Sequence, residues 1–327
     1  MPGYDFPHFS ISNVSLAMNR RCSRVKKHSR SPHPHSGVAI FSAANSAAPT
    51  SKQNGHSPVS PLGTTTFVDD DNLMQELATA IDLGELELHY QPIVCLRSHR
   101  LIGFEALTRW FHPHWGWVAP SQFIRLAEET GLIHPLGEWV LRTACLQLNQ
   151  WQQQGRNLDL KMSINLSVKQ VEYLEFAQLI HTVLNETGCQ AQNLCFEITE
   201  SQRTEDDLIA LSNISHLKSL GAEIHLDDFG NGYSNLIRLT QLPIDTLKIG
   251  RAFVHCREWE IISFMVNLAE RLGLNLIVEG IETSQELEQI KALGCQLAQG
   301  FFFSPALPAE QATHLVDDQA YTLNVFE

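Results

Sequence analysis

The sequence predicts one large α/β domain, a TIM-like (β/α)8 barrel with an antiparallel first strand, and two observations favour it. First, strand-like and helix-like segments alternate along residues 160–299. Second, polar residues close successive strands at a regular interval, because Glu197 follows Asn165 by 32 residues and precedes Asp227 by 30. One strand and one helix of a parallel sheet occupy roughly 30 residues. An open, doubly wound sheet is the competing topology.

Hydrophobic periodicity and turn residues place the individual elements. Strands are expected near residues 86–94, 101–108, 160–166, 193–199, 222–228, 244–249, 274–279 and 295–299. Helices are expected near residues 73–83, 121–130, 136–154, 172–186, 204–220, 258–272 and 284–293. A short turn through residues 97–100 joins the first two strands, which predicts a hairpin and therefore antiparallel pairing. Alternation predicts that Phe104, Ile164 and Phe196 face the helices, while Cys195 and His225 share the opposite face with the terminal acids.

The chain divides at about residue 66. Residues 1–66 are rich in Ser, Pro, His, Asn and Gly and show no sustained hydrophobic period. Such a segment cannot bury enough apolar surface to offset its conformational entropy, so we expect a disordered low-complexity tail ahead of a domain at 67–327. The basic cluster at residues 20–30 is expected to be solvated rather than to contact a membrane or a partner.

Charge and composition exclude several classes of function. The 327-residue chain has a net charge of −13. Residues 1–66 hold seven basic side chains against Asp5, so residues 67–327 carry −19, and such a domain repels DNA or RNA polymers. No apolar run reaches the roughly 18 residues of a membrane span, and residues 1–5 lack the order of a secretory signal, so we expect a cytoplasmic protein. The seven cysteines include no C-x-x-C pair that would indicate zinc.

Oxygen-bearing side chains close several of the expected strands. Because the carboxyl ends of parallel strands meet in one rim of a barrel, acids far apart in sequence are expected to lie together there. The side chains are Glu105, Asn165, Glu197, Asp227 and Asp228. Mg²⁺ and Mn²⁺ prefer such ligands, whereas zinc usually recruits His or Cys. Any one of these acids alone is more often a helix cap or a surface salt bridge, but five at corresponding strand ends favour a metal site.

Other polar residues belong to the same rim. Lys248 either balances the charge of the acids or positions and deprotonates a water, and the sequence leaves both roles open. Arg109 pairs with a phosphate or forms a salt bridge. The glycines of segment 229–235 permit a tight, site-forming loop. His112 and His114 have weak metal spacing and are expected in a loop.

The motifs, taken in order, resemble the EAL family of bacterial cyclic-di-GMP phosphodiesterases over residues 73–310. The matching motifs are Tyr90-Gln91-Pro92-Ile93, Glu105-Ala106-Leu107, Asn165-Leu166-Ser167, Glu197-Ile198-Thr199-Glu200, Asp227-Asp228-Phe229-Gly230, Lys248, Glu279-Gly280-Ile281-Glu282 and Gln299-Gly300. A lone Glu-Ala-Leu carries no information, but the ordered set over more than two hundred positions is specific.

The resemblance implies two Mg²⁺ or Mn²⁺ ions per site, hydrolysis of cyclic di-GMP to linear pGpG, and a homodimer. It implies that Glu105, Asn165, Glu197 and Asp227 bind one metal, and that Asp227, Asp228 and Glu279 serve the second. Lys248 resembles the residue that orients or deprotonates the attacking water. Glu200 is similar to the acid that anchors the loop 229–235, and Glu282 to an acid behind the metal ligands. Gln91, Leu107, Arg109 and Gln299 fall where the family contacts the dinucleotide.

Departures from the family pattern leave alternatives open. Gly250, Asn231 and Asn235 each replace a common family residue, although none of these positions is an expected metal ligand. A catalytically weak receptor that binds cyclic di-GMP and signals through a protein partner is one alternative. An unrelated metal-dependent phosphatase on a barrel is the other.

Overall fold

Eight strands close into a barrel in the computed structural model, which describes residues 70–153, 159–199, 208–230, 239 and 242–317. The strands are β1 (Leu86–Cys95), β2 (Arg100–His112), β4 (Lys161–Leu166), β5 (Leu194–Thr199), β6 (Glu223–Asp227), β7 (Thr246–Ile249), β8 (Asn275–Val278) and β9 (Leu297–Ala298). Their order is β1-β9-β8-β7-β6-β5-β4-β2, and β2 pairs with β1 again. This closure confirms the predicted barrel and excludes the open sheet. The predicted tail lies outside the described residues.

The first strand runs against its neighbours, as predicted. β1 is antiparallel to both β2 and β9, whereas β2 and β4 to β9 pair in parallel. A turn of four residues joins β1 to β2, and its His99 has a φ of 55°. Two short antiparallel strands extend the sheet, β3 (Gly116–Val118) on β2 and β10 (Leu307–Pro308) on β1. Both are too short to produce a periodic pattern, so the sequence did not predict them.

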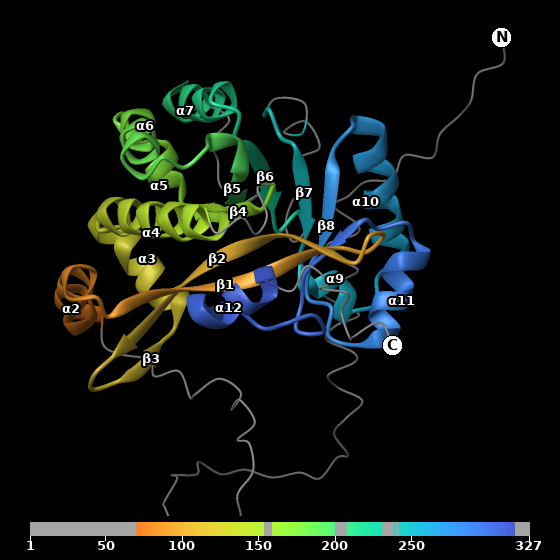
Figure 1. The fold of residues 1–327 in the computed structure, drawn as a ribbon, viewed down its shortest axis with the longest axis horizontal. Helices are drawn as coiled ribbons and strands as arrows, with labels where there is room; N and C mark the ends of the chain where they lie inside the picture. The colour runs from red at the N-terminus through yellow and green to blue at the C-terminus, as the bar shows by residue number, and fades with distance from the viewer. Residues whose placement is uncertain (1–69, 154–158, 200–207, 231–238, 240–241, 318–327) are drawn as a thin grey trace, which may run out of the picture.

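Helices surround the barrel, and Figure 1 shows α4 to α7 along one part of the sheet and α10 and α11 beside β8. The α-helices are α2 (Asp70–Leu83), α3 (Pro120–Thr130), α4 (Ile133–Gln153), α5 (Val168–Val171), α6 (Phe176–Thr187), α7 (Leu208–Ser219), α9 (Arg251–His255), α10 (Trp259–Leu272), α11 (Ser284–Ala292) and α12 (Ala309–Asp317). A 3₁₀ turn, η1 (Ala191–Asn193), precedes β5. None of the described helices is long and apolar enough to cross a membrane.

Local sequence signals account for most helix ends. Pro120 begins α3, and Gly188 and Gly273 end α6 and α10 in the left-handed conformation that glycine adopts without strain. The single helix predicted at 172–186 was wrong in its first part. Ser167 and Gln170 form a capping box that starts the separate one-turn helix α5, and α6 begins only at Phe176.

The core lies between the strands and the helices, on the face that alternation predicted. Phe104, Ile164 and Phe196 are buried there. Trp151 of α4 packs on Phe104 and Tyr90, with ring centroids 4.9 Å and 5.1 Å away. Residues on the opposite strand face point into the barrel, so the interior is free to hold polar side chains at its carboxyl rim.

Candidate active site

The polar residues that end the strands gather at one rim of the barrel. The strand register brings these residues to the same height along the barrel axis. Gln91 lies opposite Glu105, and Asn165 lies opposite Glu197. In the next pair of strands Asp227 ends β6 opposite Thr199 of β5. The rim predicted from strand endings is therefore present.

Lys248 of β7 lies at the centre of four rim carboxylates and is fully buried. From its Nζ the distances are 2.5 Å to Glu197 Oε2, 2.8 Å to Glu279 Oε1, 3.3 Å to Glu105 Oε2 and 3.6 Å to Asp227 Oδ1. These acids come from β5, β2 and β6 and from the segment after β8. A single ammonium thus compensates for part of a strongly negative site.

The charge around Lys248 favours its protonated form. Burial alone disfavours the ammonium, but the facing carboxylates, Asp227 and Glu105 foremost, outweigh burial and raise the pKa of Lys248 well above its ordinary value. In this arrangement Lys248 balances charge. A role as proton acceptor requires additional positive charge beside it, which bound cations would supply.

The pKa values of the rim acids shift in opposite directions in this shared environment. Burial raises the pKa of Glu279 to about 8 and that of Asp227 to about 6, and neighbouring negative charges add to the effect. Burial also opposes ionisation of Glu197, but Lys248 and His225 outweigh it and lower the pKa of Glu197 to about 2. The site therefore holds more negative charge than its own cation neutralises, as expected where divalent ions bind.

Two carboxylate oxygens of the rim are buried without a hydrogen-bond partner among the described residues. They are Glu197 Oε1 and Asp227 Oδ1. Buried polar atoms are normally satisfied, so such orphans indicate a ligand position. Together with the oxygen-only donor set, they fit Mg²⁺ or Mn²⁺ better than a softer ion.

Amide side chains hold Glu105 from two sides. Asn165 Nδ2 donates to Glu105 Oε1 at 2.8 Å, and Gln299 Nε2 donates to Glu105 Oε2 at 2.7 Å. The same Gln299 nitrogen lies 3.0 Å from Gln91 Oε1, and Gln91 Nε2 donates to the Ser304 carbonyl at 3.3 Å. These contacts orient Glu105 and leave the Asn165 oxygen available for another ligand.

The residues expected beside a phosphate or base share the β2 face of Glu105. Leu107 and Arg109 follow Glu105 at intervals of two, so all three point the same way. Arg109 is half-buried, and its Nη1 donates to the Thr108 carbonyl at 3.0 Å. Asp228 is exposed at the rim and has a φ of 54°, the left-handed conformation, which turns the chain sharply after β6.

Some predicted site residues lie elsewhere or outside the described part of the chain. Glu282 is exposed, and its Oε1 lies 3.3 Å from His255 Nε2 rather than with the acids around Lys248. Glu200, Asn231 and Asn235 lie outside the described residues, while Gly250 precedes α9 in an extended conformation.

The expectation that His112 lies in a loop was wrong. His112 ends β2, is buried and stacks on Trp115 with ring centroids 3.8 Å apart. A strand that continues past the barrel to pair with β3 places it there. His114 follows in the turn between the two strands, as expected.

His225 is the residue that the sequence placed on the correct face without assigning it a role. It is buried, and its Nδ1 lies 3.8 Å from Glu197 Oε1. Its Nε2 lies 3.3 Å from Glu223 Oε2. Cys195, Glu223 and His225 offer ligand atoms within 4.8 Å of one another. Alternation could have revealed their shared face, but only strand register reveals that they meet.

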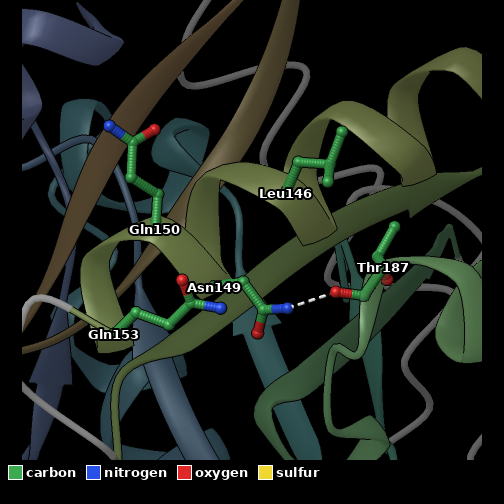
Figure 2. A pocket seen from close by; sticks show the side chains of 5 residues that line it. All are labelled: Leu146, Asn149, Gln150, Gln153 and Thr187. Atoms are coloured by element: carbon green, nitrogen blue, oxygen red, sulfur yellow. Dashed lines mark hydrogen bonds between the residues drawn. The ribbon is translucent and has the colours of Figure 1, made fainter.

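A surface pocket of about 410 Å³ lies apart from the rim. Figure 2 shows it against α4, lined by Leu146, Asn149, Gln150 and Gln153, with Thr187 at the end of α6. The Asn149 amide donates to the Thr187 carbonyl across it. It holds amides and a leucine but no acid, so it offers no chemistry comparable to the rim.

A match to a family model decides the classification. The EAL domain model matches residues 74–306. The chain belongs to the EAL domain family. This agrees with the resemblance seen in the motifs.

Individual EAL relatives support the assignment. The chain is 38% identical over 244 residues to the bifunctional diguanylate cyclase/cyclic di-GMP phosphodiesterase MucR of Pseudomonas aeruginosa, covering 73% of this chain and 36% of MucR. It is 36% identical over 247 residues to the uncharacterized protein Rv1357c of Mycobacterium tuberculosis, covering 73% of this chain and 80% of that protein. The chain spans about a third of the length of the first curated relatives that it matches.

Solved EAL structures share the fold. The PaMucR phosphodiesterase in complex with c-di-GMP superposes with a TM-score of 0.70 at 38% identity, covering 74% of this chain and 99% of that chain. The EAL enzyme Bd1971, in its form bound to cAMP and cyclic-di-GMP, gives a TM-score of 0.72 at 33% identity, covering 76% and 69%. The barrel is therefore that of experimentally determined EAL domains.

Proposed function

We propose that the chain is a metal-dependent phosphodiesterase that hydrolyses cyclic di-GMP to linear pGpG. One observation carries the proposal: four acids from separate strand ends surround Lys248, and two of their oxygens are buried without a hydrogen-bond partner among the described residues. MucR, a relative named as a cyclic di-GMP phosphodiesterase and solved in complex with c-di-GMP, supports the choice of substrate.

The acids and Asn165 would hold two divalent ions, Mg²⁺ or Mn²⁺. Glu105, Asn165, Glu197 and Asp227 would bind one, and Asp227, Asp228 and Glu279 would serve the other. When bound, the ions would supply an activated water and neutralise charge on the leaving oxygen. Asp227 and Asp228 are adjacent at the end of β6, which suits a carboxylate pair shared between two ions.

Lys248 would orient the attacking water or accept its proton. Its ammonium needs the nearby divalent charge to lose its proton readily, because the four acids alone stabilise the protonated form. Carboxylates that hold the ions would stabilise the Lys248 ammonium less. Lys248 would then contribute only when the site is loaded.

The remaining rim residues would bind the dinucleotide. Arg109 can pair bidentately with a phosphate, and Leu107 offers an apolar surface for a base, both on the β2 face of Glu105. Gln91 and Gln299 would donate or accept at the ribose or phosphate. Glu200 would anchor the loop 229–235, and Glu282 would act from the periphery of the site.

The alternative is a receptor that binds cyclic di-GMP without turning it over. The contacts of Lys248 are a reason to test this receptor function, because an ammonium that contacts four acids resists displacement by cations. A receptor would bind the ligand tightly, and its signal would pass through a protein partner.

One assay separates these functions. Purified chain is incubated with cyclic di-GMP and Mg²⁺ or Mn²⁺, and products are resolved by chromatography. Formation of pGpG, lost when the metal is chelated and regained when it is restored, supports the phosphodiesterase. Tight binding without turnover supports the receptor. Hydrolysis of other phosphodiesters or monoesters while cyclic di-GMP is ignored supports an unrelated phosphatase.

Two further expectations need separate tests. A homodimer is proposed from the family resemblance alone, and light scattering at micromolar concentration checks it, because a monomer mass would contradict it. The cytoplasmic location stays a prediction that fractionation of cells producing the chain would test.

A further inference from the structure

A second polar cluster lies inside the barrel below the rim, where β5 and β6 run side by side (Figure 1). Cys195 of β5 pairs in register with Glu223 of β6, and Glu197 pairs with His225. Cys195 and His225 are buried, and Glu223 lies at the start of β6, at the end of the barrel away from the rim. None of the proposed reaction steps uses these three side chains.

The separations of the ligand atoms are close to those around a single small ion. Glu223 Oε2 lies 3.3 Å from His225 Nε2 and 3.9 Å from Cys195 Sγ, and all three atoms lie within 4.8 Å of one another. Ligands at about 2.0 to 2.3 Å from a tetrahedral zinc ion stand roughly 3.3 to 3.6 Å apart. The Glu223–His225 pair already has this separation, and a side-chain rotation that draws the Cys195 sulfur closer by up to about 1 Å would bring all three atoms to coordinating positions.

Lys161 orients the Glu223 carboxylate so that one of its oxygens faces the position of such an ion. Its Nζ lies 2.8 Å from Glu223 Oε1 and also donates to the Gln192 carbonyl at 2.6 Å. Lys161 therefore occupies one oxygen of Glu223, while the other oxygen is turned toward Cys195 and His225. A thiolate and a carboxylate would together neutralise a divalent ion, which matters in a buried site.

We propose that Cys195, Glu223 and His225 form a zinc-binding site inside the barrel, distinct from the Mg²⁺ or Mn²⁺ site at the rim. Sulfur, imidazole and carboxylate ligands select zinc or cobalt over magnesium, calcium or manganese. On binding, the Cys195 thiol releases its proton to solvent and its sulfur bonds to the ion. Water takes the fourth position from the side of Glu223, whose side chain is 30% exposed.

The second ring nitrogen of His225 connects the proposed zinc site with the rim. Coordination through Nε2 fixes the tautomer with the proton on Nδ1, which faces Glu197 Oε1 at 3.8 Å. Both atoms lack a hydrogen-bond partner among the described residues. A small rotation would complete a carboxylate–histidine–zinc arrangement, in which the ion orients a rim ligand. This last step rests on the proposed function of the rim, whereas the zinc site itself does not.

Cobalt(II) spectroscopy of the full chain tests the site directly. Co²⁺ added to metal-free protein should give thiolate-to-metal charge-transfer absorption and the visible bands of a tetrahedral ion. The absorption should saturate at one equivalent and disappear on addition of Zn²⁺, while excess Mg²⁺ should leave it unchanged. The oxygen ligands of the rim produce no thiolate band, so failure of the hydrolysis assay would not affect this result.

Substitution variants identify which cysteine supplies the sulfur ligand. Cys195→Ser should abolish the charge-transfer band and weaken Zn²⁺ binding by roughly 100-fold or more, since losing even an outer partner of a metal ligand costs about 10- to 100-fold. His225→Gln should weaken binding as well. Cys295→Ser, which removes another buried free thiol, and Cys95→Ser, which removes a half-buried one, should leave the band intact.

Circular dichroism confirms that each variant is folded. Absence of a charge-transfer band in the wild-type protein would overturn the proposal without recourse to any variant. Retention of the band in Cys195→Ser, or its loss in Cys295→Ser or Cys95→Ser, would overturn it as well, because the ion would then be bound to other thiols.

Discussion

The two polar layers of the barrel interior are built on the same strands but differ in chemistry. The upper layer, at the carboxyl rim, presents oxygens from Glu197 and Asp227 around the buried ammonium of Lys248. The lower layer, two residues earlier on β5 and β6, presents Cys195 and His225. Strand alternation puts both layers on one face, and the residue type at each level selects the ion that can bind.

Each layer contains one lysine, and the two lysines differ in exposure. Lys248 is fully buried among four acids, whereas the side chain of Lys161 is 30% exposed and faces the single acid Glu223. The rim is therefore a site of concentrated charge that needs cations, and the lower cluster is nearly balanced without them.

The largest expected effect is on catalysis at the rim. Glu105→Ala should lower hydrolysis of cyclic di-GMP by at least about 10²- to 10³-fold, the scale of losing one preorganised electrostatic group, and measured turnover should fall below detection. Glu186→Gln, which changes an exposed acid near the end of α6, should leave turnover unchanged. The Co²⁺ spectrum of Glu105→Ala should match that of the wild type. Substantial turnover by this variant would remove Glu105 from the proposed metal site.

The next effect is on stability without metal. Lys248→Met leaves two buried and two half-buried carboxylates without their cation, so the free energy of unfolding in a chelator should fall by about 3 to 5 kcal/mol in denaturant titrations. Mg²⁺ should restore part of the loss, because cations replace the missing charge. Lys161→Met should lower it by only about 1 kcal/mol or less, since that pair is partly exposed. Equal losses in both variants would contradict the distinction between the two layers.

Metal binding at the rim should stabilise the native protein. Free Mg²⁺ or Mn²⁺ at 100 times its dissociation constant should add about 2.7 kcal/mol to the free energy of unfolding. Glu197→Gln should remove much of this gain, whereas Cys195→Ser should keep it, because the thiol belongs to the lower layer. A gain lost in Cys195→Ser but kept in Glu197→Gln would reverse our assignment of the ions.

A smaller effect is expected from the amide that holds Glu105. Gln299 donates to Glu105 at 2.7 Å, so Gln299→Ala should lower metal affinity or turnover by about 10- to 100-fold. Gln296→Ala, at an exposed position before β9, provides the control. A titration with Mn²⁺ measures the metal affinity of the variant, and an assay at saturating Mn²⁺ then measures its turnover. The two measurements together distinguish a loss of metal affinity from a loss of turnover. A turnover equal to that of the Gln296→Ala control at every metal concentration would show that Gln299 has no positioning role.

The sequence was sufficient for the barrel because each of its eight strands carried its own local signal. Intervals of 30 and 32 residues between strand-ending polar residues indicated repeated units, and the turn at 97–100 indicated the antiparallel first strand. The helix predicted at 172–186 began four residues before α6, which starts at Phe176. The one-turn helix α5 was not predicted, because four residues are too few to show a helical period.

The rim was predictable because its acids end strands, and strand ends of a barrel converge whatever the register. The lower cluster was not, because Cys195 meets Glu223 only through a particular register of β5 on β6. Cysteine spacing gave no zinc signal, since the three ligands come from two strands and include one cysteine. The contacts of Lys248 with all four acids likewise depend on side-chain packing that no sequence pattern records.

The smallest effect is expected at Glu282, the acid that the family resemblance assigned to the site periphery. It is exposed and lies 3.3 Å from His255 Nε2 on α9. Because an exposed pair of this kind contributes roughly 0 to 1 kcal/mol, Glu282→Gln should change unfolding free energy little and turnover by no more than a few-fold. His255→Gln should give the same result if the pair acts only locally. A loss of turnover comparable to that of Glu105→Ala, with His255→Gln unaffected, would mean that Glu282 leaves His255 and joins the rim when substrate binds.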